Sequence, residues 1–72
     1  MNFNEWKKKE IERLKNVLIS LEKNIFNCRE DYQYNFNNGD MVSCDMLRKE
    51  LHHLCETKSN IKLEINHLKR MY

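Results

Sequence analysis

Apolar residues recur at alternating steps of three and four along two stretches of this chain of 72 residues. The first stretch runs from Ile11 to Tyr32, the second runs from Leu47 to Tyr72, and the polar segment 37–40 separates them. A helix is the regular structure that brings positions at this spacing onto one stripe. The two stretches therefore predict an all-α fold, an antiparallel two-helix hairpin packed like a coiled coil. We expect a single domain over 1–72, with helices over about 4–34 and 42–70 and a turn over about 35–41.

The two apolar stripes are expected to form the seam between the arms. The seam positions are Ile11, Leu14, Leu18, Leu21, Ile25, Cys28 and Tyr32 in the first arm, and Leu47, Leu51, Leu54, Lys58, Ile61, Ile65, Leu68 and Tyr72 in the second. In an antiparallel pair, residues whose numbers sum to 79 then face one another, so that Leu14 faces Ile65. Lys58 is the one charged residue of the seam and faces Leu21. Either its stem packs on Leu21 while the ammonium reaches solvent, or its charge specifies a register or a partner.

Side chains that can cap helices mark the expected ends of both arms. Asn2, with Glu5 three residues later, resembles a capping box, and Asn4 is the alternative cap of the first helix. Gly39 is the one residue of the Asn-rich stretch that adopts a left-handed conformation without strain. The second helix is expected to begin directly after its N-cap, which is either Asp40 or Ser43.

The small size of the chain predicts that it works with a partner. Below about 70 to 80 residues a single core rarely supplies more than about 3 to 5 kcal/mol, and two helices form no concave pocket. We therefore expect a non-enzymatic protein without a cofactor. The first residues lack the apolar core of a signal peptide, and no run reaches the ~18 apolar residues of a membrane span. These features favour a cytoplasmic location, in a bacterial or other host cell, with no membrane partner.

The three cysteines predict reduced thiols rather than a disulfide framework or a zinc finger. Cys28, Cys44 and Cys55 are odd in number and have no CxxC spacing, and the first two fall on the seam. His52 and Glu56 share a helical face as metal ligands often do, but the first arm offers no matching pair. We therefore expect no metal site.

The positions beside the seam divide the charges by sign. A basic flank carries Lys8, Lys15, Arg29, Arg48, Lys62 and Lys69, with Glu22 as its one acid, and an acidic flank carries Glu10, Asp31, Glu50 and Glu64. Like charges then meet across the seam, which costs a few tenths of a kcal/mol per pair and favours an opposite charge from outside. The flanks are complementary to those of a second copy, so we expect a homodimer of hairpins that forms a four-helix bundle.

Several apolar residues fall outside the seam and are the predicted protein interface. They are Val17, Ile19, Phe26, Cys55, Leu63 and Met71. A second hairpin or another protein would cover them. Alternatively, Ile19 and Phe26 are scattered surface apolar residues, which are common in folded proteins.

Positive charge gathers where the two chain ends should meet. Residues 1–15 and 58–72 carry nine Lys and Arg against four acids, a net of +5, whereas residues 16–57 carry four against seven, a net of −3, and the two sum to +2. The basic open end consists of Trp6, Lys7, Lys8, Lys9, Arg13, Lys15, Lys62, Lys69, Arg70 and Tyr72. Clustered cations with aromatic residues are what single-stranded nucleic acid binds, so nucleic-acid binding is an alternative function.

The segment 11–19 also resembles the first helix of the small sporulation-type phosphatases, helical hairpins that remove phosphate from the aspartyl-phosphate of response regulators. Their second helix carries a Ser-Gln-x-Leu-Asp motif, and the nearest segment here runs from Ser59 to Glu64, with Asn for Gln, Glu for Asp and one extra residue. The extra residue turns Glu64 by ~100° around the helix. The resemblance implies aspartyl-phosphate phosphatase activity as a remote alternative.

Together these features predict a small adaptor, inhibitor or regulator that acts by docking on another protein. The bias toward Asn, Lys and Ile is typical of an AT-rich genome, and a regulator of this size would suit a phage or a prophage. The sequence does not identify the partner.

Overall fold

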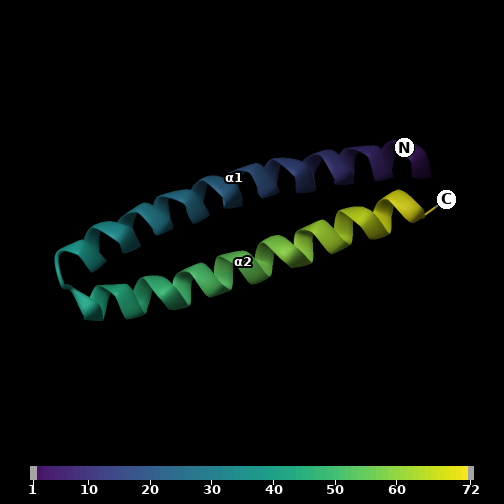
Figure 1. The fold of residues 1–72 in the computed structure, drawn as a ribbon. Helices are drawn as coiled ribbons and strands as arrows, with labels where there is room; N and C mark the ends of the chain where they lie inside the picture. The colour runs from purple at the N-terminus through teal and green to yellow at the C-terminus, as the bar shows by residue number, and fades with distance from the viewer. Residues whose placement is uncertain (1, 72) are drawn as a thin grey trace.

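The chain folds as a helical hairpin. The computed structural model describes residues 2–71, which form two helices, α1 (Phe3–Asn37) and α2 (Met41–Arg70), and no strand. The helices lie antiparallel along their whole length, and both chain ends lie at the same end of the molecule (Figure 1). The principal extents of 55 × 14 × 13 Å are those of one pair of helices. The predicted all-α hairpin is confirmed.

Asn2 caps the start of α1. Its Oδ1 accepts a hydrogen bond of 2.8 Å from the backbone N–H of Glu5, which satisfies one of the four free donors of the first turn. Asn4 lies inside the helix. The capping-box position of Glu5 was therefore the informative signal, because it located the cap at Asn2 and not at Asn4.

The end of α1 lies three residues beyond the expected end at residue 34. The N–H of Asp40 donates to the carbonyl of Asn35 (2.9 Å), and the N–H of Gly39 donates to that of Phe36 (3.1 Å). This pair of bonds is a Schellman motif, which needs a left-handed residue just past the helix, and Gly39 supplies it with φ of 74°. Side chains in this stretch bond within the last turns of the helix, where Gln33 donates to Asn37 and the Asn38 amide donates to the carbonyl of Tyr34.

Asp40 begins α2 directly after this motif. Its Oδ1 accepts from the N–H of Ser43 (3.1 Å) and its Oδ2 accepts from the Ser43 hydroxyl (2.7 Å). These two hydrogen bonds, the side-chain bond first, hold the pKa of the Asp40 carboxyl below its usual value. The connection between the helices is therefore only Asn38, Gly39 and Asp40, shorter than the expected turn over about 35–41.

The seam forms two clusters of buried side chains. The cluster nearer the chain ends contains Leu14, Ile65 and Leu68, against which Ile11, Leu18, Ile61 and Met71 pack. The cluster nearer the turn contains Ile25, Cys28 and Leu54, against which Leu21, Leu47 and Leu51 pack. Five facing pairs whose numbers sum to 79 fall within one cluster each, as the heptad register predicts: those of Ile11, Leu14 and Leu18 in the first cluster and those of Ile25 and Cys28 in the second.

Two cysteines take part in the seam as small apolar residues that also donate weak hydrogen bonds. The Sγ of Cys28 lies 3.6 Å from the carbonyl oxygen of Leu47. Cys44 is fully buried, and its Sγ lies 3.8 Å from the carbonyl oxygen of Tyr32. Burial is the main cause that raises the pKa of the Cys28 thiol. Both thiols are therefore placed for packing and not for nucleophilic chemistry.

Lys58 is held by an acid from the other helix. Its Nζ lies 3.6 Å from Oε1 of Glu22, and 31% of the Lys58 side chain is exposed to solvent. The stem therefore lies in the seam and the ammonium leaves it on the basic flank. Glu22, the one acid of that flank, is occupied by this contact.

Neither helix in the described part of the chain is long and apolar enough to cross a membrane.

Candidate functional site

The hairpin presents two broad faces of opposite charge. The flanking positions on the two sides of a coiled-coil seam point to opposite sides of a pair of helices, so the basic flank and the acidic flank form opposite faces of the molecule. We call the basic face the basic flank together with Ile19 and Phe26, which lie next to it on α1, and Cys55, which belongs to it on α2. The acidic face carries the acidic flank.

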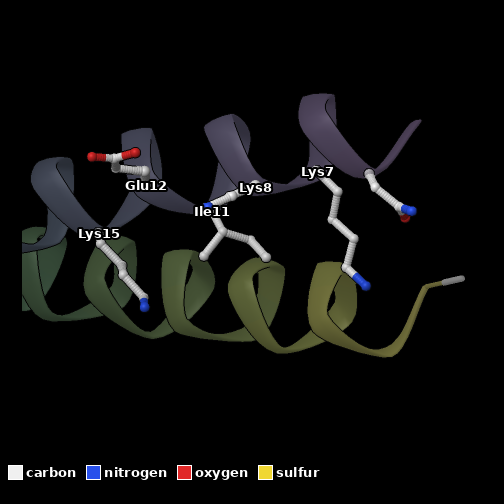
Figure 2. Close-up of a pocket in the computed structure, with 6 residues that line it drawn as sticks. Lys7, Lys8, Ile11, Glu12 and Lys15 are labelled. Atoms are coloured by element: carbon white, nitrogen blue, oxygen red, sulfur yellow. The ribbon is translucent and has the colours of Figure 1, made fainter. Parts of the chain in front are cut away.

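A groove runs along the open half of the basic face. One hollow of about 460 Å³ is lined by Asn4, Lys7, Lys8, Ile11, Glu12 and Lys15, and a second of about 250 Å³ by Lys15, Leu18, Lys62, Ile65, Asn66 and Lys69. Lys15 belongs to both. In Figure 2, Lys7 and Lys15 reach from α1 toward α2 on either side of Ile11, and Glu12 is turned away from α2. We call this surface the lysine groove: Lys8, Lys15, Lys62 and Lys69 over a floor of Ile11, Leu18 and Ile65.

The four lysines of the groove form no ion pair within residues 2–71. The four ion pairs found there are Arg13–Glu10, Arg48–Asp45, His52–Glu56 and Lys58–Glu22. Lys15 and Lys62 line the same hollow from opposite helices, as expected for like charges that meet across the seam. The groove is therefore a surface of uncompensated positive charge over aliphatic side chains.

Two other members of the predicted basic open end have partners inside the hairpin. The Nζ of Lys7 donates to the carbonyl of Met71 (2.5 Å) and lies 3.5 Å from that of Lys69. A cation is favourable at the end of a helix, so Lys7 ties the start of α1 to the end of α2. Arg13 donates to Glu10, and this contact lowers the pKa of Glu10 and raises that of Arg13.

The predicted basic open end is thus distributed around the molecule. Arg13 lies toward the acidic face beside Glu10, while Lys9 and Arg70 lie at outward-facing helix positions. The aromatic residues of this end contact each other, with the ring centroids of Phe3 and Trp6 5.9 Å apart. Tyr72 lies outside the described residues.

The predicted protein interface is divided as well, and half of it lies on the basic face. Phe26 and Cys55 line a hollow of about 320 Å³ together with Ile25 and three charged residues, Glu22, Arg29 and Lys58. Ile19 lies two helical turns before Phe26, on the same side of α1. Ile19 and Phe26 remain 64% and 60% exposed. These side chains therefore lie on the same face as the lysine groove, nearer the middle of the hairpin.

The other predicted interface residues lie elsewhere. Val17 lies seven residues after Glu10 and therefore occupies the same heptad position, on the acidic face. Leu63 occupies an outward-facing position of α2. Met71 is half-buried against the cluster of Leu14. Only Ile19, Phe26 and Cys55 are therefore brought to one face.

Large apolar side chains are also exposed near the turn, which sequence reasoning did not single out. The exposed side chains here are Tyr34, Phe36, Met41, Val42 and Met46. The extra helical turn of α1 places Phe36 on the helix, with its ring 6.2 Å from that of Tyr32. The density of large apolar residues between 34 and 46 was the available signal, but the expected turn over about 35–41 divides this stretch.

The residues considered for metal or phosphatase chemistry, His52, Glu56, Ser59 and Glu64, lie at exposed positions of α2. His52 and Glu56 are exposed and 3.7 Å apart, and within residues 2–71 no three His, Cys, Asp or Glu side chains gather as metal ligands would. Ser59 and Glu64 lie five residues apart on α2 and so project ~140° from each other.

Among the described residues, the two faces are the features from which a function can be proposed. The basic face joins apolar side chains to unpaired lysines on one continuous side of the hairpin. Comparisons with family models, with curated proteins and with solved structures found no match to this chain.

Proposed function

We propose that this hairpin is a small non-enzymatic adaptor or inhibitor that acts by docking its basic face on another protein. The observation that supports this proposal is the exposure of Ile19 and Phe26 beside the hollow lined by Cys55. Grouped apolar side chains with a charged rim are typical of surfaces that bind proteins. A hairpin face of this kind completes a helical bundle with a helix of the partner.

The apolar centre of the basic face is expected to supply most of the binding energy. Full burial of a Phe or Ile side chain is worth about 1.5 to 3 kcal/mol, and energetic hot spots are commonly large side chains at the centre of an interface. Binding would also stabilise the hairpin itself, because a partner that binds only the folded state shifts the folding equilibrium toward it.

Site-specific photo-crosslinking in the cells that produce the protein tests this proposal. The variant Phe26→p-benzoylphenylalanine places the photoreactive group on the basic face, and Lys23→p-benzoylphenylalanine places it on the outer side of the same helix. We expect one crosslinked protein from position 26 and none from position 23. Phe26→Glu, with helix content unchanged by circular dichroism, should abolish co-purification of that protein. Equal crosslinking from both positions contradicts the proposal.

Self-association is a second candidate, which the opposite charges of the two faces favour. These faces lie on opposite sides of the hairpin, so a basic face docked on an acidic face leaves one free face on each copy and continues as a stack. A closed two-fold dimer instead joins two basic faces through Ile19 and Phe26 and brings their lysines together. We expect such a dimer to strengthen as salt screens that repulsion.

Light scattering across salt and protein concentration separates these forms. A mass of twice the chain that grows more stable with salt supports the closed dimer, whereas a mass that keeps rising with concentration and falls with salt supports the stack. A constant monomer mass rules out self-association and leaves the basic face free for a different protein.

A further inference from the structure

We infer that the partner docks an acidic amphipathic helix along the lysine groove, with its apolar stripe against the groove floor and its carboxylates between the lysines. This inference rests on the proposed docking function and specifies the chemistry of the partner. Three properties of the groove support it: its charge, its floor and the spacing of its lysines.

The charge of the groove has no counterpart within the described hairpin. Lys8, Lys15, Lys62 and Lys69 form no ion pair in residues 2–71, and Glu22 is occupied by Lys58. Glu12, the acid that lines the groove, is turned away from α2 (Figure 2). Carboxylates from outside would relieve the repulsion across the seam and add complementary charge to the interface.

The floor of the groove suits apolar side chains. Ile11 and Leu18 are half-buried and Ile65 is buried, and the hollows above them lie between the lysine stems. A Leu or Ile side chain from outside would replace water over these aliphatic groups. The central hollow, lined by Phe26 and Cys55, lies farther along the same face, beside the ion pair of Lys58 with Glu22.

The spacing of the lysines matches a helix. Lys8 and Lys15 are seven residues apart on α1, as are Lys62 and Lys69 on α2. Two rows of charge therefore repeat about every 10.5 Å, which is the length of one heptad at 1.5 Å per residue. A helix with acids at both positions beside its apolar stripe presents carboxylates at the same interval. From Lys8 to Phe26 is about 27 Å, the length of a helix of about 18 residues.

A nucleic acid fits these observations less well. Single strands are held by stacking of bases on aromatic side chains within a basic groove. Here the floor is aliphatic, and Phe3 and Trp6, which contact each other, do not line the groove. An oligonucleotide is therefore included in the test as a competing outcome.

The test uses fluorescence anisotropy with a labelled helical peptide of about 21 residues, three heptads long, with Leu at the two seam positions and Glu at both flanking positions. A matched peptide carries Lys in place of every Glu, and oligothymidine of about 20 nucleotides serves as the third probe. The protein is compared with Lys15→Glu/Lys62→Glu, which reverses two charges of the groove. The control variant, Lys23→Glu/Lys49→Glu, makes the same change of net charge at exposed positions outside the groove.

We expect the acidic peptide to bind the protein and the control variant about equally, and Lys15→Glu/Lys62→Glu at least about tenfold more weakly. The lysine peptide should bind the groove variant more tightly than it binds the unaltered protein, because two of the four positive charges of the groove are then negative. Circular dichroism checks that each variant keeps its helix content.

Three results would overturn the inference. They are no binding of the acidic peptide, equal weakening by both double variants, and tighter binding of oligothymidine with a steep loss in salt. The proposed function is judged separately by crosslinking from position 26. If crosslinking persists while the acidic peptide does not bind, docking stands and the acidic-helix partner is wrong.

Discussion

The open half and the turn half of the hairpin share one heptad pattern but are stabilised differently. In the open half, the long aliphatic side chains of Leu14, Ile65 and Leu68 are buried, and Lys7 is the side chain that ties the two chain ends. In the turn half, two buried thiols donate to carbonyls across the seam, and the Schellman motif and the Asp40 cap hold the backbone. Both halves therefore depend on apolar burial, since Ile25 and Leu54 are buried in the turn half, and the turn half adds local hydrogen bonds.

The two halves also differ on the outside. The open half carries the unpaired lysines of the lysine groove, whereas residues 16–57 have a net charge of −3. Exposed apolar side chains gather at the turn, from Tyr34 to Met46. The contrast teaches that a regular seam leaves the outer faces free to diverge, because seam packing constrains only two of every seven positions.

The largest effect is expected from truncation of the aliphatic core. Leu14→Ala leaves a cavity at a side chain that is 4% exposed and should lower the free energy of unfolding by about 2 to 5 kcal/mol. That loss is comparable to the whole stability of a chain of this size, about 3 to 5 kcal/mol. Cys28→Ala, at an equally buried position in the turn half, should cost only about 1 kcal/mol. Urea unfolding followed by circular dichroism compares the two, and equal losses would remove the contrast between the halves.

A smaller effect is expected at the turn. Gly39→Ala forces a residue with a Cβ into a φ of 74°, and no atom lies within 4 Å of that Cβ, so the cost comes from the backbone alone. We expect a loss of about 1 to 2 kcal/mol in the free energy of unfolding. Gly39→Asn is the control and should lose less, because Asn tolerates the left-handed region. If Gly39→Ala is as stable as the parent, the Schellman motif does not limit the stability of the turn half.

The contact that closes the open end should have a more local effect. Lys7→Ala removes the cation from the last carbonyls of α2 and should cost at most about 1 kcal/mol. Hydrogen exchange should accelerate in the last turn of α2 while the amides near the turn are unchanged. Lys9→Ala removes a lysine from an exposed position of the same helix and should leave exchange unaltered. Uniform acceleration along both helices would indicate global destabilisation instead.

The smallest effect is expected from titration of Asp40, because its carboxylate is exposed and screened by water. Its pKa is lower in the folded state, so the ionised form stabilises the fold above the usual Asp pKa of about 3.9, and this contribution is lost as the pH falls through the lower folded value. Asp40→Ser keeps a capping side chain without the titration. Thermal unfolding between about pH 5 and pH 2 should therefore show a shallower loss for Asp40→Ser than for the parent. Parallel profiles would show that the cap contributes no pH dependence.

The sequence predicted the hairpin well because helical periodicity is a repeated signal. Each seam position reports independently on the same stripe, and the register follows from antiparallel pairing. The end of α1 was predicted three residues too early because Asn is common in turns, whereas Asn35 and Asn37 are helical here. The helix ends where the backbone can become left-handed, at Gly39.

The candidate site was predicted only in part. The sign of each flank could be assigned from heptad positions, but the roles of individual cations could not. Lys7 and Arg13 resembled the other basic residues in sequence, yet Lys7 binds the end of α2 and Arg13 pairs with Glu10. Such contacts depend on side-chain reach and on the distance between helices, which periodicity does not encode.

By itself the sequence determined the number of helices, their antiparallel pairing and the division of charge between two flanks, because each of these follows from residue spacing alone. Only the tertiary structure decided which charges are already paired, which apolar residues share the basic face and where hollows open beside the seam. The reason is that a heptad position specifies only an angle around a helix. A binding surface also requires that side chains from both helices lie at the same level along the hairpin axis and that they are not already paired within the molecule.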